Sequence, residues 1–109
     1  MAQYQPELDL VAVAANGRLA AFCIGWLHPH QPIARVEPLG VHPDFHRLGL
    51  GKAILSDLLQ RLRIDNVQFV SLHITPDNEA AVKLYESMGF GRTKMLLGSQ
   101  RKLAIVACQ

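Results

Sequence analysis

Two glycines, Gly49 and Gly51, lie where an apolar stretch gives way to a helical pattern, within residues 41–52. The first turn of a helix has unpaired backbone N–H groups, and the helix dipole adds partial positive charge there. Glycine lets a ligand approach the backbone closely, and Arg47 and Lys52 place positive charge beside it. This segment therefore predicts the binding of a phosphate-bearing ligand.

The spacing excludes two common phosphate-binding motifs. A P-loop requires a glycine where His46 stands, and Ser or Thr where Ala53 stands. A dinucleotide-binding fingerprint requires a third glycine at the position of Ile54, and an acidic residue at a suitable distance that this chain lacks. Another kind of phosphate-binding loop is needed to explain the glycines.

The loop resembles the acyl-CoA loop of GNAT-type N-acetyltransferases, in which Arg or Gln is followed by two residues and then Gly-x-Gly. His46 stands where that family has Arg or Gln, and Leu48 stands where a basic residue is frequent. A histidine can still donate a hydrogen bond, so this departure changes the electrostatics more than the geometry.

Residues 78–90 resemble a second motif of the same family, a helix that runs from an Asn to a Tyr and ends at Gly-Phe. Here these residues are Asn78, Tyr85, Gly89 and Phe90. The two motifs occur in the family's order, separated by one predicted helix and one predicted strand, and this combination is far more specific than Gly-x-Gly alone.

The resemblance implies a site for acetyl-CoA, used as a co-substrate without a metal. It assigns the Leu39 backbone N–H to the thioester oxygen, the Val41 N–H to pantetheine, and the amides from Arg47 to Lys52 to the pyrophosphate. The full set of implied cofactor-binding residues is Leu39, Gly40, Val41, His46, Arg47, Leu48, Gly49, Leu50, Gly51, Lys52, Asn78 and Tyr85.

The resemblance also implies that Tyr85 is the general acid that protonates the CoA sulfur. Tyr85 lies seven residues after Asn78, on the same helix face. By itself, a tyrosine at this position would be interpreted as a core aromatic residue.

Glu37 is the candidate base, directly or through water, and the alternative is an ion pair between Arg35 and Glu37. Neither cysteine has a base at motif spacing, so we expect direct attack of the amine without a covalent enzyme intermediate.

Composition narrows the class of protein. The chain has 109 residues, half of them apolar, and a net charge of +2 at pH 7, so we expect one domain over residues 1–109 and no nucleic-acid partner. The sequence has no leader-like start and no apolar run of membrane-spanning length, which predicts a soluble, cytoplasmic protein without a membrane partner. Cys23 and Cys108 are isolated and have apolar neighbours, as in a reducing compartment.

Histidines do not form a metal motif. Four of the five, His28, His30, His42 and His46, lie in predicted loops, without a cysteine or an acidic residue at ligand-like spacing. We therefore predict no metal site. His73 lies on a predicted strand, where a structural role and a proton-relay role both remain open.

Hydrophobic periodicity gives the order strand, strand, strand, helix, strand, helix, strand, strand. The strands are predicted over residues 8–14, 18–27, 33–41, 67–74, 90–97 and 102–107, and the helices over 49–63 and from 75–77 to Gly89. Asn16-Gly17 predicts a hairpin, and Pro38 predicts a bulge or unpaired edge. In strand 33–41, alternation would place Ile33, Arg35, Glu37, Leu39 and Val41 on one face, opposite Pro38 and Gly40.

This order implies an α/β (α+β) GNAT-like fold, a mixed and mostly antiparallel sheet of about six strands with two main helices. Family members usually begin with another strand and one or two helices that help to form the acceptor site, so this chain resembles an N-terminally short form. A second subunit could cover the open sheet edge, and we therefore expect a homodimer. Besides the enzyme, a non-catalytic acyl-CoA-binding module or fragment of a larger assembly, and a structural domain without CoA binding, remain as alternatives.

Overall fold

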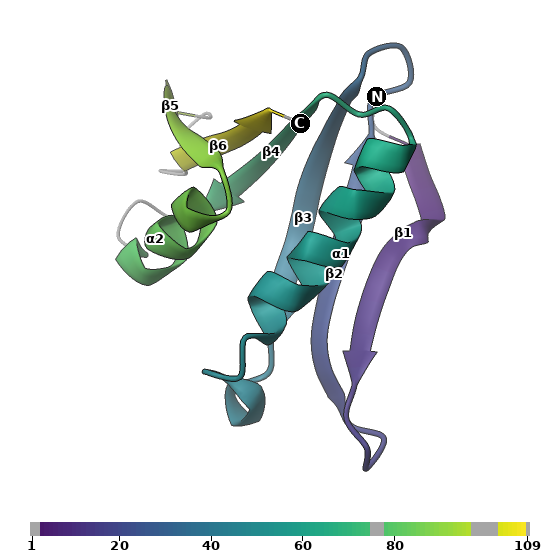
Figure 1. Cartoon of the computed structure of the whole chain (residues 1–109), viewed down its shortest axis with the longest axis vertical. Helices are drawn as coiled ribbons and strands as arrows, with labels where there is room; N and C mark the ends of the chain where they lie inside the picture. The colour runs from purple at the N-terminus through teal and green to yellow at the C-terminus, as the bar shows by residue number, and fades with distance from the viewer. Residues whose placement is uncertain (1–2, 75–77, 97–102, 109) are drawn as a thin grey trace.

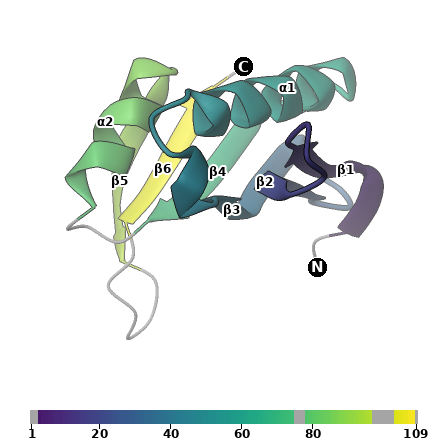
Figure 2. The same cartoon turned by 90° about the horizontal axis from the view of Figure 1, so that it is seen from below.

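A six-stranded sheet with two main helices on one face forms the part of the chain that the computed structural model describes, residues 3–74, 78–96 and 103–108 (Figures 1 and 2). Only β3 and β4 pair in parallel, so the sheet is mixed and mostly antiparallel, as predicted. In chain order the elements are β1 (Gln3–Val13), β2 (Leu19–Leu27), β3 (Ile33–Val41), the 3-10 helix η1 (Pro43–Phe45), α1 (Leu50–Ile64), β4 (Phe69–Ile74), α2 (Glu79–Ser87), β5 (Phe90–Leu96) and β6 (Leu103–Cys108).

The strand order in space is β1-β2-β3-β4-β6-β5, so β6 lies between β4 and β5. β1 and β2 form the predicted hairpin, whose turn places Gly17 at φ +85, and the Ala14 N–H donates to the Arg18 carbonyl at 2.8 Å. β1 begins at Gln3, earlier than predicted, with an irregular register between Tyr4 and Asp9. No helix within the described ranges has the length and apolar character needed to cross a membrane.

The core lies between the sheet and α1. Helical spacing places Ile54, Leu55, Leu58 and Leu62 on the buried face of α1, and Leu58 packs closely against β2. These side chains meet buried residues of four strands, which are Leu8, Leu10, Ala21, Cys23, Ala34, Val36, Val70 and Leu72. Removal of this much apolar surface from water is the main force that fixes α1 on the sheet.

β3 contains the bulge that Pro38 predicted, and it changes which side chains share a face. Val36 pairs with Gly25 and Leu39 pairs with Cys23, so two residues of β3 oppose one residue of β2. The extra residue reverses the alternation. Leu39 and Val41 therefore pack against the core on the same face as Val36, and the prediction that they share the face of Arg35 was wrong.

The parallel pairing of β3 with β4 ends just before this bulge. It joins residues 33–36 to residues 69–72, and beyond Val36 and Leu72 no further pair between these strands is formed within the described residues. Figure 1 shows the result: β1–β3 with α1 form one half, and β4–β6 with α2 form the other. Such a separation leaves the end of β3 beside an opening.

α2 begins at Glu79, later than predicted, and ends just before Gly89 as predicted. Asn78 is the N-cap, and its side-chain oxygen accepts a hydrogen bond from the Ala81 N–H at 3.3 Å. Gly89 follows the helix at φ +101, in the left-handed region that favours glycine. β5 and β6 then pair antiparallel. The predicted capping role of residues 75–77 and the turn at residues 98–99 lie outside the described residues.

Candidate functional site

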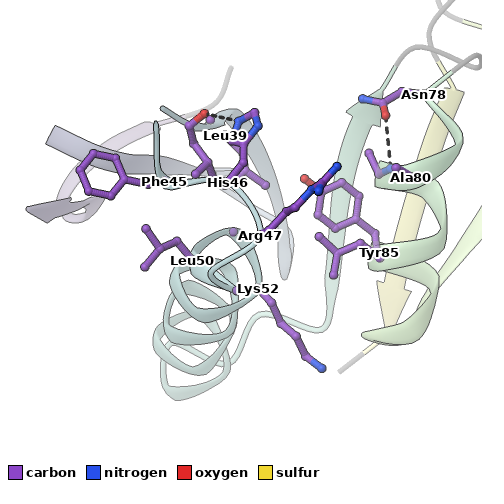
Figure 3. Close-up of a pocket in the computed structure, with 15 residues that line it drawn as sticks. Leu39, Phe45, His46, Arg47, Leu50, Lys52, Asn78, Ala80 and Tyr85 are labelled. Carbon is purple, nitrogen blue, oxygen red and sulfur yellow. Dashed lines mark hydrogen bonds between the residues drawn. The ribbon is translucent and has the colours of Figure 1, made fainter. Parts of the chain in front are cut away.

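A cavity of about 600 Å³ opens where the two halves of the sheet separate (Figure 3). Its walls come from the end of β3, the loop after η1, the start of α1 and one face of α2. Eleven of the twelve residues implied for the cofactor lie on it, and only Leu48 does not. The lining residues are Leu39, Gly40, Val41, Phe45, His46, Arg47, Gly49, Leu50, Gly51, Lys52, Asn78, Ala80, Ala81, Leu84 and Tyr85.

The loop between η1 and α1 has the backbone expected of an anion-binding turn. Gly49 is the N-cap of α1 at φ +76, and Arg47 is also left-handed at φ +65. Glycine adopts this conformation without the steric penalty of a Cβ atom, which explains its use at position 49. The first turn of α1 has no acidic residue, so the positive end of the helix dipole is not offset there.

Charged side chains lie beside these amides. In Figure 3, Arg47 extends from the loop toward α2, between the wall that carries Phe45 and Leu50 and the wall that carries Tyr85. Lys52 lines the cavity from the first turn of α1. The loop therefore combines N–H donors with two cationic side chains, a combination that suits a phosphate. Leu48 is 67% exposed and does not line the cavity.

His46 is held by the protein itself. Its Nε2 lies 2.9 Å from the Val41 carbonyl oxygen, so the ring closes the loop back onto the end of β3. Upstream, the His42 Nδ1 accepts a hydrogen bond from the Asp44 N–H at 3.1 Å and caps η1. Where the family has Arg or Gln, this chain thus uses a histidine that fixes the shape of the loop.

Tyr85 lines the cavity from α2. It is 8% exposed, and its ring contacts Phe90 edge to face at a centroid distance of 6.1 Å. Burial, with a smaller contribution from Cys23, raises the pKa of the Tyr85 hydroxyl above its ordinary value, so the group is protonated at neutral pH. No hydrogen bond joins this hydroxyl to another residue of the described ranges. A protonated hydroxyl that faces a cavity is suited to donate a proton.

Glu37 lies outside this cavity, in an adjoining hollow of about 220 Å³ that shares Leu39 and Tyr85 with it and also contains His73. The Glu37 Oε2 lies 3.5 Å from the Arg35 Nε, with both side chains nearly half exposed. The ion pair considered from the sequence is therefore formed. An exposed pair of this kind contributes little stability.

Sequence motifs missed four residues of the lining, Phe45, Ala80, Ala81 and Leu84. The helical spacing of Asn78, Ala81 and Tyr85 was a usable signal for the α2 residues, since positions three and four apart share a face. Phe45 had no comparable signal because η1 is only three residues long. Within residues 3–74, 78–96 and 103–108, no group of three or more His, Cys, Asp or Glu side chains is arranged to hold a metal ion.

Comparison with known proteins adds an independent result. The acetyltransferase (GNAT) family profile matches residues 1–90. The chain is 40% identical over 93 residues to a mycothiol acetyltransferase of Paenarthrobacter aurescens, covering 82% of this chain and 29% of that protein. It is 39% identical over 75 residues to the [ribosomal protein bS18]-alanine N-acetyltransferase of Escherichia coli, covering 69% of this chain and 49% of that protein. The chain thus spans less than half the length of these curated relatives.

Solved structures give the same result for the fold. Ard1 from Thermoplasma volcanium superposes with a TM-score of 0.85 at 27% identity, covering 96% of this chain and 72% of that one. The structure of the E. coli ribosomal-protein-S18-alanine N-acetyltransferase superposes with a TM-score of 0.72 at 32% identity, covering 94% of this chain and 68% of that one.

Proposed function

Because the chain belongs to the acetyltransferase (GNAT) family, we propose that it binds acetyl-CoA in the cavity and transfers the acetyl group to a primary amine by direct attack in a ternary complex. One observation carries this proposal: the loop before α1, which offers backbone N–H groups, and Tyr85, which offers a hydroxyl, line the same cavity. The first suits a pyrophosphate, and the second suits a leaving thiolate.

In the proposed complex, the backbone amides from Arg47 to Lys52 bind the pyrophosphate. The pantetheine arm follows the end of β3, where the pairing with β4 has ended. The Leu39 N–H then polarises the thioester oxygen as a preorganised donor, and the Val41 N–H holds pantetheine. Asn78, the N-cap of α2, is proposed to form a hydrogen bond with the pantetheine arm. Its side-chain oxygen also accepts the capping hydrogen bond from the Ala81 N–H.

The proposed chemistry is a single acyl transfer. The amine nitrogen attacks the thioester carbon, the carbon–sulfur bond breaks, and Tyr85 gives its proton to the leaving sulfur. The attacking amine loses a proton to Glu37, directly or through a water molecule. The shared wall formed by Leu39 and Tyr85 supports this assignment, because it places the hollow with Glu37 next to the cavity.

The role of Glu37 can be separated from that of its ion pair. We expect Glu37→Gln to lower kcat/KM for the amine by about 100-fold, the size typical of a lost general base. The matched control is Arg35→Gln, which breaks the same 3.5 Å pair but keeps the carboxylate. Steady-state kinetics with both variants checks this. Equal losses in the two variants would show that Glu37 serves only the ion pair.

A non-catalytic acyl-CoA-binding module is the second candidate, and the ion pair between Glu37 and Arg35 is the observation that favours it.

For the proposed enzyme, the acceptor is specified only as a primary amine. Of the relatives, one is named for a ribosomal protein alanine and the other for mycothiol, and these names describe those proteins.

We also propose that the chain forms a homodimer through β1. This strand is at the edge of the sheet, where Val11 and Val13 are each 59% exposed. An edge strand with exposed apolar side chains is prone to pair with another chain. Sedimentation velocity at micromolar concentrations should detect a dimer, and a monomer throughout that range would contradict the proposal.

Calorimetric titration with acetyl-CoA and with CoA tests the proposed function most directly. Saturable heat is expected with both ligands. When an amine acceptor is then added to the protein with acetyl-CoA, free CoA should be released. Binding without turnover over a broad screen of primary amines would favour the non-catalytic module. No binding of either ligand at millimolar concentration would contradict both candidates.

A further inference from the structure

An arginine outside the cavity contacts the segment that leads into the phosphate-binding loop. Arg18 lies at the start of β2, just after the hairpin turn, and its Nη2 donates to the Asp44 Oδ2 at 2.6 Å. The centre of the same guanidinium lies 5.3 Å from the centroid of the Phe45 ring. One side chain thus makes two contacts with consecutive residues of η1, far away in the sequence.

Both ends of this contact are fixed. The Arg18 N–H donates to the Asn16 side-chain oxygen at 3.0 Å, and the Arg18 carbonyl accepts from the Ala14 N–H at 2.8 Å, so the hairpin turn holds its backbone. In η1, the Phe45 N–H donates to the His42 carbonyl at 2.8 Å. These hydrogen bonds hold both backbones, and the planar guanidinium of an arginine suits a carboxylate.

The contact continues into the cavity. Phe45, which Arg18 covers, is part of the lining, and His46 and Arg47 follow it directly. We propose that Arg18 is a positioning residue, which through Asp44 and Phe45 holds η1 in the place that presents the phosphate-binding loop to acetyl-CoA. This inference rests on the proposed function for its ligand, but the contact itself can be tested without one.

The electrostatics fit this role. The Arg18 guanidinium, first by its hydrogen bond and then by its charge, holds the pKa of the Asp44 carboxyl below its ordinary value, and His42 adds a smaller effect in the same direction. Asp44 is therefore ionised at neutral pH, and its negative charge lies close to the site proposed for a polyanion. A carboxylate at this position repels a polyanion. Its presence is explained if it holds the loop in place.

Because Asp44 carries a negative charge, the two possible roles of Arg18 predict opposite effects of Asp44→Asn on the binding of CoA. If Arg18 acts only by attracting the polyanion, Arg18→Gln weakens the binding of CoA, whereas Asp44→Asn strengthens it. If Arg18 positions η1, both variants weaken binding, by about three- to tenfold for an exposed ion pair combined with a cation–π contact. In that case the double variant is no weaker than either single variant, because both remove the same contact.

The experiment combines two measurements on the full chain. Hydrogen exchange without ligand should be faster at the Phe45 and His46 amides in both single variants, since η1 opens more often. Calorimetry with CoA should give the raised Kd, and kinetics should give a raised KM for acetyl-CoA with unchanged kcat. The matched controls are Arg61→Gln and Asp57→Asn, which break an exposed Arg–Asp pair of 3.2 Å on α1, away from the cavity.

The outcomes separate the inference from the proposed function. Tighter or unchanged binding in Asp44→Asn, or unchanged exchange in both single variants, overturns the positioning role. Equal weakening by the Arg61→Gln control overturns it as well, because a general charge effect would then be sufficient. If exchange is faster in both single variants but the unmodified chain does not bind CoA, the contact is structural only, and its role toward the ligand is overturned together with the proposed function.

Discussion

Tyr85→Phe is expected to lower kcat by on the order of 10²- to 10⁴-fold while the Kd for acetyl-CoA changes little. The substitution removes one oxygen atom and retains the ring that contacts Phe90 and lines the cavity. Because burial raises the pKa of the Tyr85 hydroxyl above 10.0, the acid stays protonated until the pH exceeds that value. In the unmodified chain, loss of activity by deprotonation of this acid is therefore expected only above pH 10.0.

The chain offers a matched control in its second tyrosine. Tyr4 is exposed, donates a hydrogen bond to Asp9 at 2.6 Å and does not line the cavity, so Tyr4→Phe should leave kcat unchanged. Turnover at saturating acetyl-CoA, together with calorimetric Kd values, distinguishes the two variants. Full activity in Tyr85→Phe would show that another group protonates the sulfur, and that Tyr85 is a core aromatic residue.

Gly51→Leu is expected to weaken the binding of acetyl-CoA by about 100-fold, the factor that corresponds to about 3 kcal/mol of overpacking. A Cβ atom at position 51 would lie 3.5 Å from the Val41 Cγ2, an ordinary contact, so the chain itself accepts a side chain there. The remaining atoms of a leucine would extend into the space that the pyrophosphate needs. Because Gly51 lies within α1, its replacement should maintain or raise the Tm.

Ala53→Leu is the matched control for Gly51→Leu. Ala53 is an exposed residue of α1 two positions further on and does not line the cavity. Calorimetry should find its Kd for acetyl-CoA unchanged, while circular dichroism shows both variants folded. If a folded Gly51→Leu variant bound acetyl-CoA as tightly as the unmodified chain, the assignment of this loop to the pyrophosphate would be wrong.

Much of this architecture could be predicted because its local signals agree with the global fold. The apolar spacing of α1, the turn at Asn16-Gly17 and the left-handed glycine at position 89 each correspond to an element that the structure contains. The two motifs also identified both walls of the cavity, since each motif forms one wall. Local sequence therefore determined the parts that depend on local geometry.

What the sequence could not predict depends on contacts between distant residues. Pro38 indicated a bulge, but only the pairing with β2 shows that it reverses the faces of Leu39 and Val41. Asp44 is 26 residues from Arg18 in the chain and Phe45 is 27, and both precede the Gly-x-Gly motif. Phe45 enters the lining because η1 is held there by contacts that periodicity does not contain.

Because the pairing between β3 and β4 ends early, few backbone hydrogen bonds of the sheet join its two halves within the described ranges. In the described part of the chain, the ladder that joins the two halves covers only residues 33–36 and 69–72. Proteins open in cooperative units of unequal stability, so each half is expected to behave as such a unit, with this ladder as their boundary. A ligand that contacts both walls favours the state in which the units are docked. Acetyl-CoA would then be part of the folded framework as well as the donor of its acetyl group.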